Sequence, residues 1–140
     1  MNYPFLKPVL TCIAILLVSC NSSAQEVNFK DIQPGGLAEL LSGKEVVIID
    51  VRTPPEWERG KVESALTINL NHREFLSAVD ELDREPSYLI YCNSGNRSRV
   101  ASYHMTRMGF ENIYNYNGTH FQIRREYEQI RQAEYGSTQH

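Results

Sequence analysis

The residues best suited to chemistry stand in one short stretch, Tyr91-Cys-Asn-Ser-Gly-Asn-Arg-Ser98. Cys92 follows an apolar run typical of a strand, and a helix is expected to begin shortly after it. The glycine between them permits positive φ, and such a turn directs successive backbone N–H groups inward, where they bind anions. The helix N-terminus and the charge of Arg97 both favour a thiolate at Cys92. The pattern predicts a nucleophilic cysteine in an anion-binding loop, whose other members are Asn93, Ser94, Gly95, Asn96, Arg97 and Ser98.

Three other roles for Cys92 fit the sequence less well. A free cysteine is often only a small buried apolar residue, but the glycine-containing loop and the arginine that follow favour a function here. A thiol–disulfide oxidoreductase needs a second cysteine close by, and this loop contains none. A zinc site is disfavoured because Cys92, His104 and His120 lack the spacing of zinc ligands. We therefore expect neither a metal nor another cofactor.

Alternating strands and helices are predicted to hold this loop. Val46–Asp50 (VVIID) is a continuous apolar run, as expected of a strand covered on both faces. Further strands are predicted at 65–70, 88–91 and 113–116, and helices at 54–60, 75–82, 100–108 and 121–130. Such alternation implies an α/β domain with a parallel sheet, whose strands bind ligands at their carboxyl ends. The polar tail after Ile130 is expected to fray.

Composition excludes several classes of protein. The chain has 140 residues, of which 41% are hydrophobic and 22% are charged. These proportions exclude a collagenous or disordered chain. The net charge of −3 gives no sign of a nucleic-acid footprint, and we expect no nucleic-acid partner. Three cysteines are too few, and odd in number, for a disulfide scaffold.

The N-terminus carries the features of an export signal. Lys7 precedes an apolar run, Val9–Val18. This run is too short to span a bilayer as a helix. Leu17-Val-Ser-Cys20 resembles the lipobox of bacterial lipoproteins, which implies a signal peptide at 1–19, lipidation of Cys20 and a tether at 20–26. The expected location is the bacterial cell envelope, lipid-anchored and facing the periplasm, and Asn21 favours the outer membrane by analogy with that family.

Over roughly residues 27–132, the sequence resembles the rhodanese-like sulfurtransferase family. Residues 133–140 are expected to form a flexible tail. Val47–Gly60 is similar to the family's "IIDVRxxxEWxxGH" segment, 91–98 to its "YCxSGxRS" loop, and Met108–Gly118 to its "xGFxxVxxLxGG" segment. The resemblance implies a five-stranded parallel sheet flanked by helices on both faces.

The resemblance also implies a reaction. Cys92 would attack the outer sulfur of an anionic sulfane donor such as thiosulfate and become a persulfide, and cyanide, a thiol or a sulfur-accepting protein would then take the sulfur. Backbone N–H groups from Asn93 to Ser98 would hold the persulfide, while Arg97 would hold the donor. Asp50 and Arg52 match the family's "DVR" and are expected to support the base of the loop. For Arg52 we expect an ion pair with Glu56 or Glu58.

Two alternatives to a sulfurtransferase remain. Rhodanese-like phosphatases carry the wider C-x5-R loop, whereas Cys92 and Arg97 form C-x4-R, which disfavours a phosphatase or an arsenate reductase-like enzyme. A module that carries sulfur or docks a partner without turnover stays open. The sequence departs from the family pattern at Lys61, usually His, and at Thr119, usually Gly. His120 lies in the same late turn, which in the family borders the mouth of the active site. We expect an exposed loop residue there, with contact to the substrate as the alternative.

Overall fold

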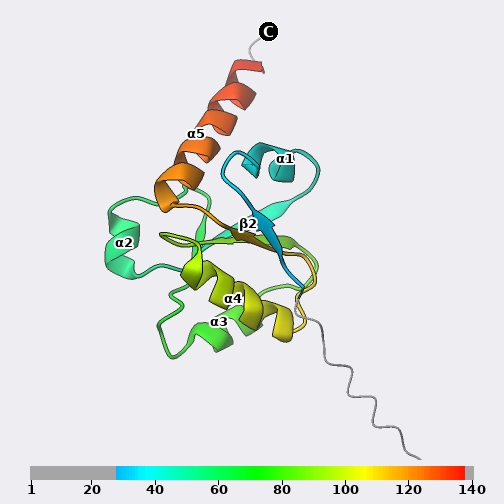
Figure 1. The fold of residues 1–140 in the computed structure, drawn as a ribbon, viewed down its shortest axis with the longest axis vertical. Coiled ribbons are helices and arrows are strands. Elements are labelled where there is room, and N and C mark those ends of the chain that lie inside the picture. The colour runs from blue at the N-terminus through cyan, green and yellow to red at the C-terminus, as the bar shows by residue number, and fades with distance from the viewer. Residues whose placement is uncertain (1–27, 138–140) are drawn as a thin grey trace, which may run out of the picture.

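A five-stranded parallel sheet runs through the computed structural model, which describes residues 28–137 (Figure 1). Its strands are β1 (Lys30–Ile32), β2 (Val46–Asp50), β3 (Leu66–Thr67), β4 (Ser87–Tyr91) and β5 (Ile113–Tyr116), in the order β1-β5-β4-β2-β3. β4 lies between β5 and β2, and every residue of this strand is buried. The loop that follows β4 therefore leaves the sheet at its centre, and the predicted α/β parallel architecture is confirmed.

Helices cover both faces of the sheet. They are α1 (Leu37–Ser42), α2 (Pro54–Glu58), α3 (Phe75–Asp80), α4 (Asn96–Arg107) and α5 (His120–Ser137). In Figure 1, α3 and α4 lie on one side of the sheet, while α1 and α5 lie on the other. α2 follows β2 directly and begins with Pro54 and Pro55, whose fixed φ suits the first turn of a helix.

Alternate residues of the central strands build the two halves of the core. Ile49 and Ile90 point toward α3 and α4, where they pack with Met105 and Phe110. Their neighbours Ile48 and Leu89 point toward α1 and α5. Because both faces are covered, the strands read as continuous apolar runs, which is the reason that the sequence predicted them.

Several boundaries differ from the sequence prediction. β1 and α1 were not predicted, because β1 is a very short strand that includes two charged residues, and α1 is a short helix. The predicted strand at 65–70 is reduced to Leu66–Thr67. The tail expected to fray is instead helical as far as Ser137, where a pair between Arg131 and Glu134 at 2.9 Å lies on the last turns of α5.

Some apolar side chains of α3 and α4 are exposed. Leu76 of α3 is 50% exposed and Val100 of α4 is 47% exposed. Each helix therefore buries only part of its apolar residues. Trp57 is only half-buried and lines a shallow hollow between α2 and α3.

The predicted signal peptide, Cys12, Cys20 and the tether lie outside the described residues. Within residues 28–137, no helix combines the length and apolar character needed to cross a bilayer.

Candidate active site

Cys92 lies directly after the central strand and is only 1% exposed. The Ser98 Oγ lies 3.5 Å from the Cys92 Sγ and 3.0 Å from the Gly95 carbonyl oxygen, so its one proton is shared between these two acceptors. Backbone N–H groups of Ser94, Gly95 and Ser98 also point at the sulfur. Burial raises the pKa of this thiol, but the hydrogen bonds outweigh burial and hold the pKa below the ordinary value. The loop is therefore built to stabilise a thiolate.

A pH profile tests this stabilisation. We expect the Cys92 alkylation rate with iodoacetamide to rise with pH through a midpoint below that of a free cysteine, because only the thiolate reacts. In Ser98→Ala the hydroxyl donor is lost, so the pKa rises and the midpoint moves to higher pH. Ser94→Ala is the matched control, since residue 94 acts through its backbone N–H and its midpoint should stay in place. Equal midpoints in all three proteins would contradict the role of the Ser98 hydroxyl.

Gly95 lets the loop close. It caps α4 with φ of 86°, in the left-handed region that favours glycine. A Cβ at this position would lie 2.8 Å from Asn117 Oδ1, on the turn between β5 and α5. The loop and that turn are therefore in close contact, and the absence of a side chain permits it.

Arg97 is held by Glu56 of α2. Its Nη1 donates to Glu56 Oε2 at 2.8 Å, and its Nη2 donates to Glu56 Oε1 at 2.7 Å. Two parallel bonds of this kind are among the strongest hydrogen-bonded pairs in proteins. The hydrogen bonds from Arg97 lower the pKa of Glu56 to about 2, so the carboxylate is charged at neutral pH. The role of Arg97 in holding the sulfur donor stays a prediction. In this structure Glu56 occupies both Nη atoms of the guanidinium that would bind the sulfur donor.

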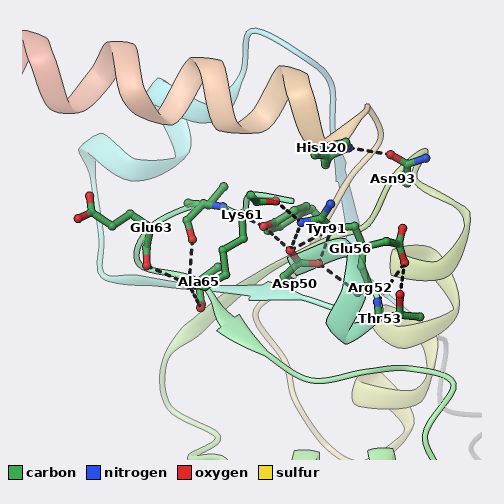
Figure 2. Close-up of polar contacts among 12 residues, drawn as sticks. Asp50, Arg52, Thr53, Glu56, Lys61, Glu63, Ala65, Tyr91, Asn93 and His120 are labelled. Carbon is green, nitrogen blue, oxygen red and sulfur yellow. Dashed lines mark hydrogen bonds and ion pairs between the residues drawn. The ribbon is translucent and has the colours of Figure 1, made fainter. Parts of the chain in front are cut away.

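Asp50, Arg52 and Tyr91 form a buried network under the loop (Figure 2). Arg52 Nη2 donates to Asp50 Oδ2 at 2.7 Å, and the Tyr91 hydroxyl donates to the same oxygen at 2.6 Å. The predicted partner of Arg52, Glu56 or Glu58, is thus wrong: the guanidinium folds back onto the carboxylate two residues earlier and also reaches the Gly60 carbonyl at 2.8 Å.

This network joins three segments at the base of the site. Tyr91, which immediately precedes Cys92, accepts a hydrogen bond from the Val62 N–H at 3.1 Å. Burial and its bond to Asp50 raise the pKa of Tyr91 well above the ordinary value, so it remains a donor. These bonds fix the ends of β2 and β4 to the segment after α2. The supporting role of Asp50 and Arg52 stays a prediction.

His120 was expected to be an exposed loop residue, but that prediction is wrong. It is the first residue of α5, is only 9% exposed, and its Nδ1 lies 2.7 Å from Asn93 Oδ1 in the cysteine loop (Figure 2). Burial and the charges of Arg52 and Arg124 lower its pKa, so the ring is neutral and can donate from Nδ1. The sequence placed both residues near the site but held no signal for their contact, which depends on how the last turn folds.

Lys61 and His104 occupy positions that the sequence singled out, and neither reaches the sulfur. The Lys61 ammonium donates to the carbonyls of Glu63 and Ala65, both at 3.2 Å (Figure 2). His104 is half-buried beside the rings of Phe75 and Tyr103. Among residues 28–137, His, Cys, Asp and Glu side chains form no group of three or more suited to a metal ion.

Known proteins share this fold and sequence pattern. A thiosulfate sulfurtransferase GlpE of Shewanella oneidensis is 24% identical over 91 residues, which cover 65% of this chain and 88% of that protein. A tRNA uridine(34) hydroxylase of Cytophaga hutchinsonii is 32% identical over 92 residues, 64% of this chain. This chain spans less than two thirds of the length of several curated relatives, and only 30% of that hydroxylase.

Solved structures and a family profile also resemble this chain, in fold and in sequence. A rhodanese-like domain protein from Staphylococcus aureus superposes with a TM-score of 0.59 at 26% identity, over 67% of this chain and 90% of that one. A rhodanese-related protein from Thermoplasma volcanium has the same TM-score and the same identity, over 70% of this chain and 92% of that one. The profile of the rhodanese-like domain matches residues 33–125, which include both the cysteine loop and its supporting network. The chain therefore belongs to the rhodanese-like domain family.

Proposed function

We propose that this protein is a sulfurtransferase that carries sulfane sulfur on Cys92. The observation that carries the proposal is the environment of that sulfur: it is buried, and three backbone N–H groups and a hydroxyl are directed at it, which lowers its pKa. A nucleophile in such a ring of donors is activated as a thiolate, and the same donors can stabilise the terminal sulfur of a persulfide.

The proposed reaction has two steps. With thiosulfate as donor, the Cys92 thiolate attacks the outer sulfur, the donor S–S bond breaks, and sulfite leaves with the bonding electrons. The product is the Cys92 persulfide anion. Cyanide or a thiolate then attacks the terminal sulfur of the persulfide, forms thiocyanate or a new persulfide, and returns the Cys92 thiolate. No net oxidation occurs in either step and no cofactor is required.

The C-x4-R loop supports sulfur transfer over phosphoryl transfer. Cys92 and Arg97 are separated by the shorter loop, which the resemblance to sulfurtransferases associates with a single sulfur atom rather than a phosphoryl group. The burial of Cys92 to 1% exposure supports a second candidate, a carrier that holds sulfur for a protein partner with little turnover.

A turnover assay separates the two candidates. The purified full chain is incubated with thiosulfate and cyanide, and thiocyanate is measured against time. An enzyme produces many equivalents of thiocyanate per protein, whereas a carrier gains one sulfur on Cys92 and releases little of it to cyanide. Production of no thiocyanate together with no sulfur on the protein would refute both.

We also propose that a lipid on Cys20 anchors the domain to a bacterial envelope membrane, where it faces the periplasm. Supporting features are the short apolar run and the Leu17-Val-Ser-Cys20 motif. When the full chain is expressed in bacteria with labelled fatty acid, we expect label on the wild type and on Cys12→Ser, and none on Cys20→Ser. Label that persists in Cys20→Ser would contradict the anchor.

A further inference from the structure

The arginines of the cysteine loop and of its supporting network are each paired with a carboxylate. Arg97 is paired with Glu56 at 2.7 Å, and Arg52 is paired with the buried Asp50, also at 2.7 Å. Arg124, whose charge acts on His120, lies 3.4 Å from Glu128. His120 itself has a lowered pKa and is neutral at neutral pH. Around the loop, these described groups therefore sum to no net positive charge before the Cys92 thiolate is counted.

This balance of charge matters for the choice of donor. Thiosulfate carries two negative charges, so it meets the thiolate as a dianion approaching an anion. A free arginine in the loop would offset that repulsion, but both prongs of the Arg97 guanidinium are engaged by Glu56. A persulfide of a thiol carries at most one negative charge, as R–S–S⁻, and none as the R–S–SH form that reacts, so it meets a weaker repulsion than thiosulfate does.

We infer that Glu56 selects the sulfur donor: by holding Arg97 it makes the loop favour thiol persulfides over thiosulfate and other dianions. The inference rests on the proposed sulfurtransferase function. In the loading step, the Cys92 thiolate attacks the outer sulfur of R–S–SH, the donor S–S bond breaks, and R–S⁻ leaves with the bonding electrons. The hydrogen stays on the transferred sulfur, so the protein becomes Cys92–S–SH and the total charge is unchanged.

Glu56 has a second, structural contact that the test must leave intact. Its Oε2 accepts from the Thr53 N–H at 3.0 Å and from the Thr53 hydroxyl at 2.7 Å, which caps the start of α2. Glutamine serves in the same capping position, because its side-chain oxygen accepts the same bonds. Glu56→Gln therefore removes the charge that neutralises Arg97 and keeps the helix cap.

The experiment compares two donors on the full chain. The donors are thiosulfate and the persulfide of 2-mercaptoethanol, and the rate of sulfur loading on Cys92 is followed by intact mass. In Glu56→Gln, the second-order rate constant for loading from thiosulfate is expected to rise about tenfold, a gain kept modest because the pair is partly exposed to solvent. The rate with the alkyl persulfide, which carries one charge fewer than thiosulfate, should rise by less than about threefold. Glu58 is an exposed residue of the same helix. Glu58→Gln is therefore the matched control, and the loading rate with either donor should stay unchanged.

The ratio of the two donors distinguishes a charge effect from a structural one. Glu56→Gln/Arg97→Gln should lose the gain with thiosulfate, because no freed cation remains. If Glu56→Gln leaves the ratio of the two donors unchanged, or slows thiosulfate, Glu56 does not select the donor and the inference is overturned. If neither donor places sulfur on Cys92 in the wild type or in Glu56→Gln, it is the proposed function that fails.

Discussion

Replacing Cys92 with alanine is expected to abolish thiocyanate formation from thiosulfate and cyanide, a loss of at least about a thousandfold. The nucleophile is removed, and within residues 28–137 no other cysteine can replace it. The remaining loop still presents its N–H groups, but these stabilise a charge that no longer forms. Initial rates of thiocyanate production by the full chain in detergent measure the effect.

The other two cysteines of the chain provide the matched control. Cys12→Ser/Cys20→Ser keeps Cys92 and removes the thiols of the N-terminal segment, so its rate should equal that of the wild type. Cys92 is buried among apolar residues. The methyl group of alanine is therefore tolerated there, and the variant should unfold at nearly the same urea concentration. A folded Cys92→Ala protein that retained thiocyanate formation would exclude Cys92 as the sulfur carrier.

Replacing Asp50 with asparagine is expected to lower the free energy of unfolding by about 3–5 kcal/mol. Asp50 and Arg52 are both buried, and removing the carboxylate charge leaves the guanidinium without a counter-charge away from water. The Tyr91 hydroxyl loses its charged acceptor in the same change. Urea unfolding followed by the fluorescence of Trp57, the only tryptophan in the chain, measures the loss.

An exposed ion pair gives the comparison for this effect. Asp80 pairs with Arg84 at 2.6 Å, but the two side chains are 68% and 40% exposed. Asp80→Asn should therefore cost less than about 1 kcal/mol. In Asp50→Leu/Arg52→Met, where neither charge remains, much of the lost stability should return. A cost for Asp50→Asn as small as that for Asp80→Asn would show that the buried network does not support the fold.

The central sheet and the cysteine loop could be predicted because their causes are local. β2 and β4 are covered on both faces and therefore read as apolar runs, and Gly95 marks the turn between β4 and α4. The edge strand β1 could not be predicted, since it is defined by its pairing with β5 and not by its own residues.

The contacts around the loop were harder to predict because they join distant residues. Arg52 was expected to pair with Glu56 or Glu58, yet Glu56 binds Arg97, 41 residues away. The contact between Asn93 and His120 likewise depends on where α5 begins. Charge and residue type indicated which side chains could pair, but only the folded chain determines which of the possible partners lies within reach.

The central claim is that Cys92 itself becomes persulfidated, and intact mass spectrometry with fragmentation tests it most directly. The full chain is treated with thiosulfate or with the persulfide of 2-mercaptoethanol, desalted and analysed without reductant. The account predicts the gain of one sulfur atom located on Cys92, which cyanide then removes as thiocyanate. An unmodified Cys92 after treatment with both donors would contradict it.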